Sequence, residues 1–291
     1  MFSYKPIKKR EKIYKSFSKL KIKSKNNLIF FFKNNYQKEL INLVNLYLAE
    51  NINYYFNKKF KSLNESISYL KKLPNLTPGG IINPRKETQT TYNLITKYII
   101  KSMDNISNKI EKAHFPVIRL KYSQNKKNRP YATSKLHSDS WVGQYGDAII
   151  SFGIDGDFIN NGVEFFLPKN VTQDFFEKIK DYDLGMKKFK GLKYLGVLKK
   201  EHFVMFDHSI LHRSKIKKNA RPRISIDFGV KIKSKYMNKK IFGDKERWQY
   251  IDIDQYNEIG KKTFLSSKYS VYDKKINLKS KKPSLSFLKI K

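Results

Sequence analysis

The sequence predicts an α+β fold with a mainly β core and a helical layer before it. Two early segments place apolar side chains at helical spacing, whereas short apolar or alternating runs separated by turn residues follow from Pro116 to Val230. The 291 residues, 40% of them hydrophobic, suffice for one large core. We therefore expect a single domain over residues 36–260, with the helices in 36–114 and the β core in 115–232.

The helical layer is expected from two apolar stripes. Gln37 to Phe60 carries the first and Thr88 to Ala113 the second, each with apolar residues three or four positions apart. A shorter helix, Ser62 to Leu73, should end before Pro74. Because an amphipathic helix needs a surface to cover, we expect this layer to pack on the outside of one sheet.

The two ends of the chain are rich in lysine. Residues 1–35 are interpreted as a basic, flexible N-terminal segment and residues 261–291 as a basic C-terminal tail. An organelle-targeting peptide is the alternative for the first segment. The apolar run Leu28 to Phe32 is far shorter than the ~20 residues that a membrane-spanning helix needs, so we expect a cytoplasmic protein without a membrane span.

Several strands are expected in the core. Val117 to Tyr122 alternates, and Tyr122 is expected to face into the barrel. The other predicted strands are Ala148–Ile154, Val163–Leu167, Leu192–Leu198, Phe203–Phe206 and Arg223–Phe228. Asp155 to Gly162 is interpreted as a turn that makes Val163–Leu167 the hairpin partner of the strand before it. Short helices are predicted at Thr172–Tyr182 and Lys245–Ile259.

A His-x-Asp pair, His137 and Asp139, is the first candidate site. In an extended strand alternate side chains share a face, so both could reach one metal ion. Two histidines and one carboxylate are a known ligand set for non-haem ferrous iron. A third ligand must come from a neighbouring strand, and both His208 and His212 follow the apolar run that ends at Phe206. The absence of cysteine leaves histidine and carboxylate as metal ligands.

A candidate anion site follows on the next strand. Arg223 and Ser225 share one face of the alternating run, and a guanidinium beside a hydroxyl suits the far carboxylate of a dicarboxylic acid. Arg221 competes with Arg223 for this role. However, Arg221 precedes Pro222, which favours a turn or the start of a strand.

These residues, in this order, resemble the Fe(II)/2-oxoglutarate-dependent dioxygenases. The resemblance covers about residues 117–230 and includes the His212-Arg213-Ser214 pattern, which favours His212 over His208 as the third ligand. The turn Gly156–Gly162 and the strand Val163–Pro168 are most similar to the branch of phytanoyl-type hydroxylases and antibiotic-biosynthesis oxygenases.

The resemblance implies a double-stranded β-helix, also called a jelly roll or cupin-like fold. It implies Fe(II) held by His137, Asp139 and His212, and 2-oxoglutarate as cosubstrate, with Arg223, Ser225 and Tyr122 in cosubstrate binding. Dioxygen would then oxidise a C–H bond of a small metabolite, for example in secondary metabolism. Related halogenases lack the carboxylate, so Asp139 favours hydroxylation or desaturation.

The formal net charge of +36 bears on the partner. Such a field attracts nucleic acid, membrane surfaces and small anions, although an AT-rich genome would also enrich lysine. The lysine-rich segment Ser123–Thr133 leads into the first ligand, and no known nucleic-acid-reading motif accompanies the charge. Arg221-Pro222-Arg223 also lacks the longer gap of the nucleic-acid demethylases. We therefore expect a small anionic substrate, with a nucleic-acid-binding or nucleic-acid-modifying protein as the alternative.

Overall fold

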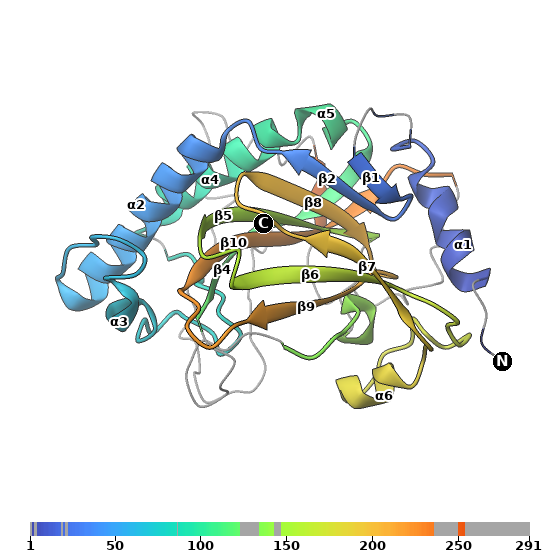
Figure 1. Cartoon of the computed structure of the whole chain (residues 1–291). Helices are drawn as coiled ribbons and strands as arrows, with labels where there is room; N and C mark the ends of the chain where they lie inside the picture. The colour runs from blue at the N-terminus through green and yellow to red at the C-terminus, as the bar shows by residue number, and fades with distance from the viewer. Residues whose placement is uncertain are drawn as a thin grey trace.

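The fold is described from a computed structural model, which describes residues 2, 5–18, 20, 23–85, 87–122, 134–142, 147–235 and 250–253. Within these ranges the chain forms two antiparallel sheets with helices beside them (Figure 1). The expectations for the segment Ser123–Thr133 and for the tail 261–291 lie outside the described residues.

Two sheets of unequal size form the core. The larger has the strand order β1-β2-β8-β5-β10-β3-β11, with β4 also paired to β10, and the smaller has the order β7-β6-β9. The strands are β1 (Lys23–Asn26), β2 (Ile29–Lys33), β3 (Ile110–His114), β4 (Val117–Lys121), β5 (Ala148–Gly156), β6 (Asn161–Pro168), β7 (Leu192–Val197), β8 (His202–Asp207), β9 (Leu211–Ile216), β10 (Arg223–Ile232) and β11 (Tyr250–Asp252).

The two sheets face each other across an aromatic layer. Phe165 of the smaller sheet lies 5.0 Å from Phe206 and 6.1 Å from Phe31 of the larger sheet, measured between ring centroids. From β7 to β10 the chain passes alternately from one sheet to the other. This winding is that of a double-stranded β-helix, so the predicted fold class is confirmed.

Helices cover the outer face of the larger sheet (Figure 1). The helical elements are α1 (Lys5–Glu11), η1 (Lys12–Tyr14), α2 (Gln37–Phe56), α3 (Ile67–Leu70), α4 (Gln89–Ser102), α5 (Asp104–Ser107), η2 (Asp139–Val142) and α6 (Tyr182–Met186). The Gln37 side chain donates to the carbonyls of Gly153 and Ile154, at 3.0 and 2.5 Å, and so joins α2 to β5. Of the described helices, none is both long and apolar enough to cross a bilayer.

The predicted second helix is shorter than expected. α4 ends at Ser102, and residues 110–114 form β3, which pairs with β10 and β11. Ile110 and Ala113, three residues apart, are both fully buried. A spacing of three residues fits one face of a helix, but it also fits a strand that is buried on both of its faces. Pairing with β10 and β11 makes residues 110–114 a strand, and the spacing of apolar residues in the sequence does not determine this by itself.

Three further expectations are corrected. β6 is not the hairpin partner of β5, because the turn at Asp157, closed by a 2.9 Å bond from the Asn160 amide to its carboxylate, carries the chain into the other sheet. At Thr172–Tyr182 the helix begins only at Tyr182. The described part of Lys245–Ile259 contains β11, paired with β3, where a helix was predicted.

The N-terminal segment, which its charge suggested to be a flexible tail, contributes helices and strands to the described fold. β2 pairs with β8 along its whole length, and helix α1 packs against the core. Its buried residues recur at intervals of three or four, at Ile7, Arg10, Ile13, Tyr14 and Phe17. This spacing gives the segment one face that the core can cover, while Lys8, Lys9, Lys12 and Lys15 are exposed.

Candidate metal centre

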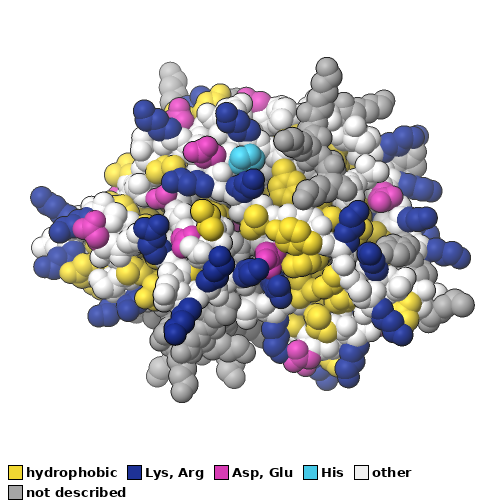
Figure 2. Space-filling model, in the orientation of Figure 1, with side chains coloured by type: hydrophobic (Ala, Val, Ile, Leu, Met, Phe, Trp, Pro, Cys, Tyr) yellow, Lys and Arg dark blue, Asp and Glu magenta, His cyan; other side chains and the backbone are white. Residues whose placement is uncertain are grey.

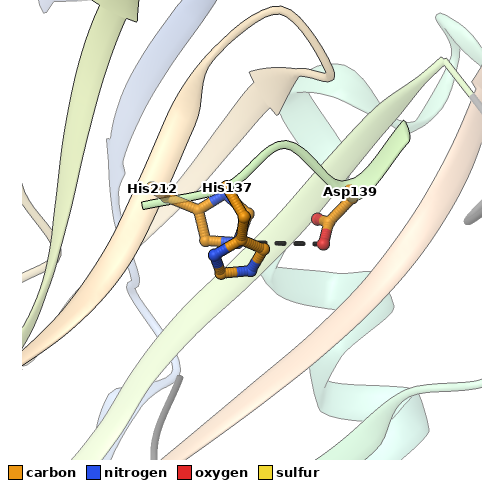
Figure 3. A group of neighbouring side chains, drawn as sticks. All are labelled: His137, Asp139 and His212. Atoms are coloured by element: carbon orange, nitrogen blue, oxygen red, sulfur yellow. Dashed lines mark ion pairs between the residues drawn. The ribbon is translucent and has the colours of Figure 1, made fainter. Parts of the chain in front are cut away.

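His137, Asp139 and His212 lie together beside β9, the edge strand of the smaller sheet (Figure 3). One ligand atom from each lies within 4.8 Å of the others. His212 Nε2 is 3.8 Å from an oxygen of Asp139, and the two imidazole centroids are 4.2 Å apart. Among the described residues, this is the group of histidine and carboxylate side chains that could hold one metal ion.

Backbone pairing brings the two histidines together. The His137 amide donates to the His212 carbonyl at 3.1 Å, and the His212 amide donates back at 2.9 Å. Residues directly opposed in an antiparallel bridge carry their side chains on the same side. The histidine at the start of β9 therefore faces the one that precedes η2.

Asp139 reaches the centre by a different route from the one expected. It does not continue a strand from His137, because η2 begins at Asp139. Ser138 stabilises this turn: its hydroxyl accepts the Ser140 amide at 3.2 Å and donates to the His208 carbonyl at 2.5 Å. The two ligands of the His-x-Asp pair are thus joined by a sharp turn, in which Ser138 points away from the metal site.

Both histidines are held in the form that binds a metal. Burial lowers the pKa of His137 to about 3 and that of His212 to about 4, so both are neutral at pH 7. His137 Nδ1 lies 2.9 Å from the Lys135 carbonyl, which accepts a hydrogen bond from the Nδ1–H group and leaves Nε2 free to bind a metal. The rival third ligand, His208, is buried but is not in the cluster of ligand atoms.

Arg223, on β10, is buried and contacts β9, the strand that carries His212. Its side chain is 1% exposed and its Nη2 donates to the Ser214 hydroxyl at 3.1 Å. Among the described residues, its Nε and Nη1 have no hydrogen-bond partner. A buried guanidinium with two nitrogens that lack hydrogen-bond partners is costly unless an anion completes it. Ser225 is also buried, and its position two residues along β10 puts it on the same face.

Two residues near Arg223 were missed as functional candidates. Ser214 lies two positions after His212 on β9, so the alternation of the strand was a usable signal. Lys121 is the register partner of Arg223 on β4 and is 4% exposed. Burial, and then the charges of Arg119 and Arg223, hold the pKa of Lys121 well below its usual range.

The inner face of β4 and β10 is therefore cationic. Arg119 forms a 2.7 Å ion pair with Asp227, Lys121 donates to the Gly79 carbonyl at 3.0 Å, and Arg223 donates to the Ser214 hydroxyl at 3.1 Å. Tyr122 lies just beyond β4, half-buried, with the Lys71 ammonium 5.9 Å from its ring centroid. Its role toward a cosubstrate stays a prediction.

A segment of residues 172–188 flanks the centre. Tyr182 stacks on His137, with centroids 4.8 Å apart, and the Ile179 amide donates to the Trp141 carbonyl at 3.0 Å. This segment lines an open pocket of about 520 Å³. The pocket is lined by Thr172, Asp174, Lys178, Ile179, Lys180, Leu184, Lys187 and Lys188. Four ammonium groups against one carboxylate make it a cationic pocket with an apolar portion.

Comparison with known proteins gives a likeness of fold only. No protein family and no curated protein matches the sequence. Among solved structures, the chain is similar to the non-heme alpha ketoglutarate dependent epimerase SnoN from nogalamycin biosynthesis, with 10% identity, a TM-score of 0.38, and 69% of this chain and 76% of that chain covered. The carbocyclase SnoK from the same biosynthesis gives 6% identity and a TM-score of 0.41, with 69% and 78% covered. EctD from S. alaskensis has 11% sequence identity and a TM-score of 0.38, with 76% of this chain and 78% of that chain covered.

Proposed function

We propose that this chain is a non-haem Fe(II)- and 2-oxoglutarate-dependent oxygenase that oxidises a C–H bond of a small molecule. The observation that carries the proposal is the pairing of a two-histidine, one-carboxylate cluster with a buried arginine whose Nε and Nη1 have no partner among the described residues. The first is a ligand set that leaves positions open on ferrous iron. The second is a site for the carboxylate of a dicarboxylic acid.

The residues fit both groups. His137 and His212 would present neutral imidazole nitrogens and Asp139 a carboxylate oxygen to Fe(II). Arg223 would hold the far carboxylate of 2-oxoglutarate, with Ser214 and Ser225 beside it. When bound, iron and cosubstrate together supply the oxidising power for breaking an unactivated C–H bond. The protein supplies ligand orientation, through the His137–Lys135 contact, and a buried surrounding.

For the substrate we propose a small anionic metabolite. The lysines of the pocket beside Tyr182 would attract its charged group, while Ile179 and Leu184 would contact an apolar part. Tyr182 links this pocket to the metal centre, because it belongs to the same segment and stacks on His137. The presence of Asp139 supports hydroxylation or desaturation.

Succinate formation tests the proposal. Purified protein with Fe(II), 2-oxoglutarate and oxygen would be assayed against a panel of anionic metabolites, neutral lipids and oligonucleotides. We expect succinate production to depend on both iron and 2-oxoglutarate and to be stimulated by one or more of the small anions. Absence of turnover with every compound would count against an oxygenase. Stimulation by neutral lipids or oligonucleotides alone would overturn only the substrate class.

A further inference from the structure

A buried ionic cluster ties the N-terminal segment to the strands that carry the metal centre. Arg10 of α1 is 2% exposed, and its Nη2 and Nε lie 2.6 and 2.9 Å from one oxygen of the fully buried Asp207. The Tyr14 hydroxyl lies 2.7 Å from the same oxygen, and Arg10 also donates to the Asp147 carbonyl at 3.0 Å. The two contacts between Arg10 and Asp207 join residues 197 positions apart in the chain.

Asp207 stands at the start of the turn that leads to His212. Its second carboxylate oxygen accepts the Ser209 amide at 2.7 Å, and its carbonyl accepts the Ile210 amide at 2.9 Å. His212 follows as the second residue of β9. The Asp207 carboxylate therefore binds Arg10 through one oxygen and, through the other, stabilises the turn that leads to His212.

The same turn also contacts Ser138, the residue between the other two ligands. The Ser138 hydroxyl, between His137 and Asp139 in the sequence, donates to the carbonyl of His208 at 2.5 Å. A displacement of the turn would consequently move both halves of the triad relative to each other. Residues behind metal ligands that fix ligand orientation typically change metal affinity when they are altered.

We propose that Arg10 is a positioning residue for the metal centre, acting through Asp207 and the turn of residues 207–210. This inference rests on the proposed function, since it assumes that the triad holds a metal. Without Arg10, the Asp207 carboxylate would be a buried charge without its guanidinium partner. We expect it to move, and the turn that it holds through the Ser209 amide would move with it. The N-terminal segment is thereby part of the site, although it contributes no ligand.

Metal affinity of the folded, metal-free protein tests this proposal without relying on turnover. Co(II), a stand-in for Fe(II) that resists oxidation, would be titrated into the full chain well below the unfolding temperature of each variant. Arg10→Met should weaken Co(II) binding by about 10- to 100-fold, the range typical of residues that support metal ligands. Arg10→Lys keeps the charge but loses the two-pronged donor group of the guanidinium, so its Co(II) affinity should lie between those of Arg10→Met and the unaltered chain. The control is Lys12→Met, which removes an exposed charge from the same segment and should bind as the unaltered chain does.

The outcomes separate a positioning role from a structural one. A lowered unfolding temperature for Arg10→Met with unchanged Co(II) affinity would overturn the proposal. If Arg10→Met does not fold, Tyr14→Phe decides, because it removes one hydrogen bond to Asp207 and leaves the ion pair. It should weaken Co(II) binding several-fold, and equal affinity would contradict the inference. If the unaltered chain and His212→Ala bind Co(II) equally, the proposed function fails and takes this inference with it.

Discussion

Arg223 is the residue whose surroundings most directly indicate a ligand. Its guanidinium is buried and its Nε and Nη1 have no partner among the described residues. Arg223→Leu should raise the concentration of 2-oxoglutarate required for turnover. The expected cost is on the order of 2–5 kcal/mol, as for a truncated buried charge pair, or roughly 30-fold to several thousand-fold in affinity. Metal binding should be retained.

Arg221→Leu is the matched control for this measurement. Arg221 is exposed and lies two residues from Arg223, so its removal should leave the 2-oxoglutarate requirement unchanged. If Arg221→Leu raises the requirement and Arg223→Leu does not, the anion site has been assigned to the wrong arginine.

Buried histidines set the pH dependence of folding. Burial lowers the pKa of His114 to about 3, against about 6.5 in the unfolded chain. The unfolded state therefore binds more protons between these values, and the stabilisation present above pH 6.5 is lost as the pH falls toward 3. Asp147, whose pKa burial raises to about 6, acts in the opposite sense, but His137, His208 and His212 all share the direction of His114.

We accordingly expect the metal-free protein to be less stable at pH 5 than at pH 7. Each such histidine should contribute about 2 kcal/mol to the difference. Urea unfolding at the two pH values measures it, and His114→Gln should reduce the difference by that amount. A variant with the same pH dependence as the unaltered chain would show that His114 is not neutral and buried in the folded state.

At the scale of elements, the place of β10 depends on a glycine in β5. Gly156 has a φ of +98°, and a Cβ there would lie 2.2 Å from the Pro222 carbonyl oxygen and 2.6 Å from the Arg223 Cα. Both are backbone atoms that cannot rotate away. Gly156→Ala should therefore destabilise the fold, by roughly 1–3 kcal/mol or more from backbone strain alone, and should raise the 2-oxoglutarate requirement by displacing Arg223.

Gly79→Ala provides the comparison. A Cβ at Gly79 would meet no atom within 4 Å, so that variant should unfold at nearly the same urea concentration as the unaltered chain. Equal behaviour of the two variants would mean that the close approach of β5 to β10 does not fix Arg223.

The sequence predicted local elements better than their pairing. Alternation and apolar runs placed β4, β8 and β10 correctly, because each is buried on a face that its own residues define. Nothing local could show that β6 joins β7 and β9, since strand partners are chosen by contacts far apart in the chain.

For the site, residue order indicated His137, Asp139 and His212 as a group, and the structure brings these three together. The contribution of Lys121 could not be predicted in the same way. It becomes visible only when β4 is set beside β10, opposite Arg223. Arg10 was not recognised as a buried residue because lysines surround it in the sequence, although its spacing from Ile7 and Tyr14 is that of one helix face.

At the scale of the whole molecule, the chain carries a formal net charge of +36. Figure 2 shows lysine and arginine side chains distributed over the visible face, with acidic groups between them. A spread of this kind attracts small anions without forming a single stripe along which a nucleic-acid backbone would lie. It favours the small-anion proposal over the nucleic-acid alternative on this face.

Salt should therefore weaken binding of the substrate. For an anionic compound that stimulates succinate formation, the apparent affinity should fall as ionic strength rises, because the Debye length shortens from ~10 Å at 0.1 M to ~3 Å at 1 M salt. The measurement is the Michaelis constant across a salt series, with a neutral analogue as control. Affinity that does not change with salt, or tight salt-dependent binding to duplex DNA with no turnover, would favour the alternatives.

The central claim is that His137, Asp139 and His212 together hold ferrous iron, and anaerobic Fe(II) titration of three proteins tests it most directly. The unaltered chain should bind one Fe(II) per molecule, His212→Ala should lose this binding, and His208→Ala, which changes a buried histidine outside the cluster, should keep much of it. Retained binding in His212→Ala together with lost binding in His208→Ala would contradict the account.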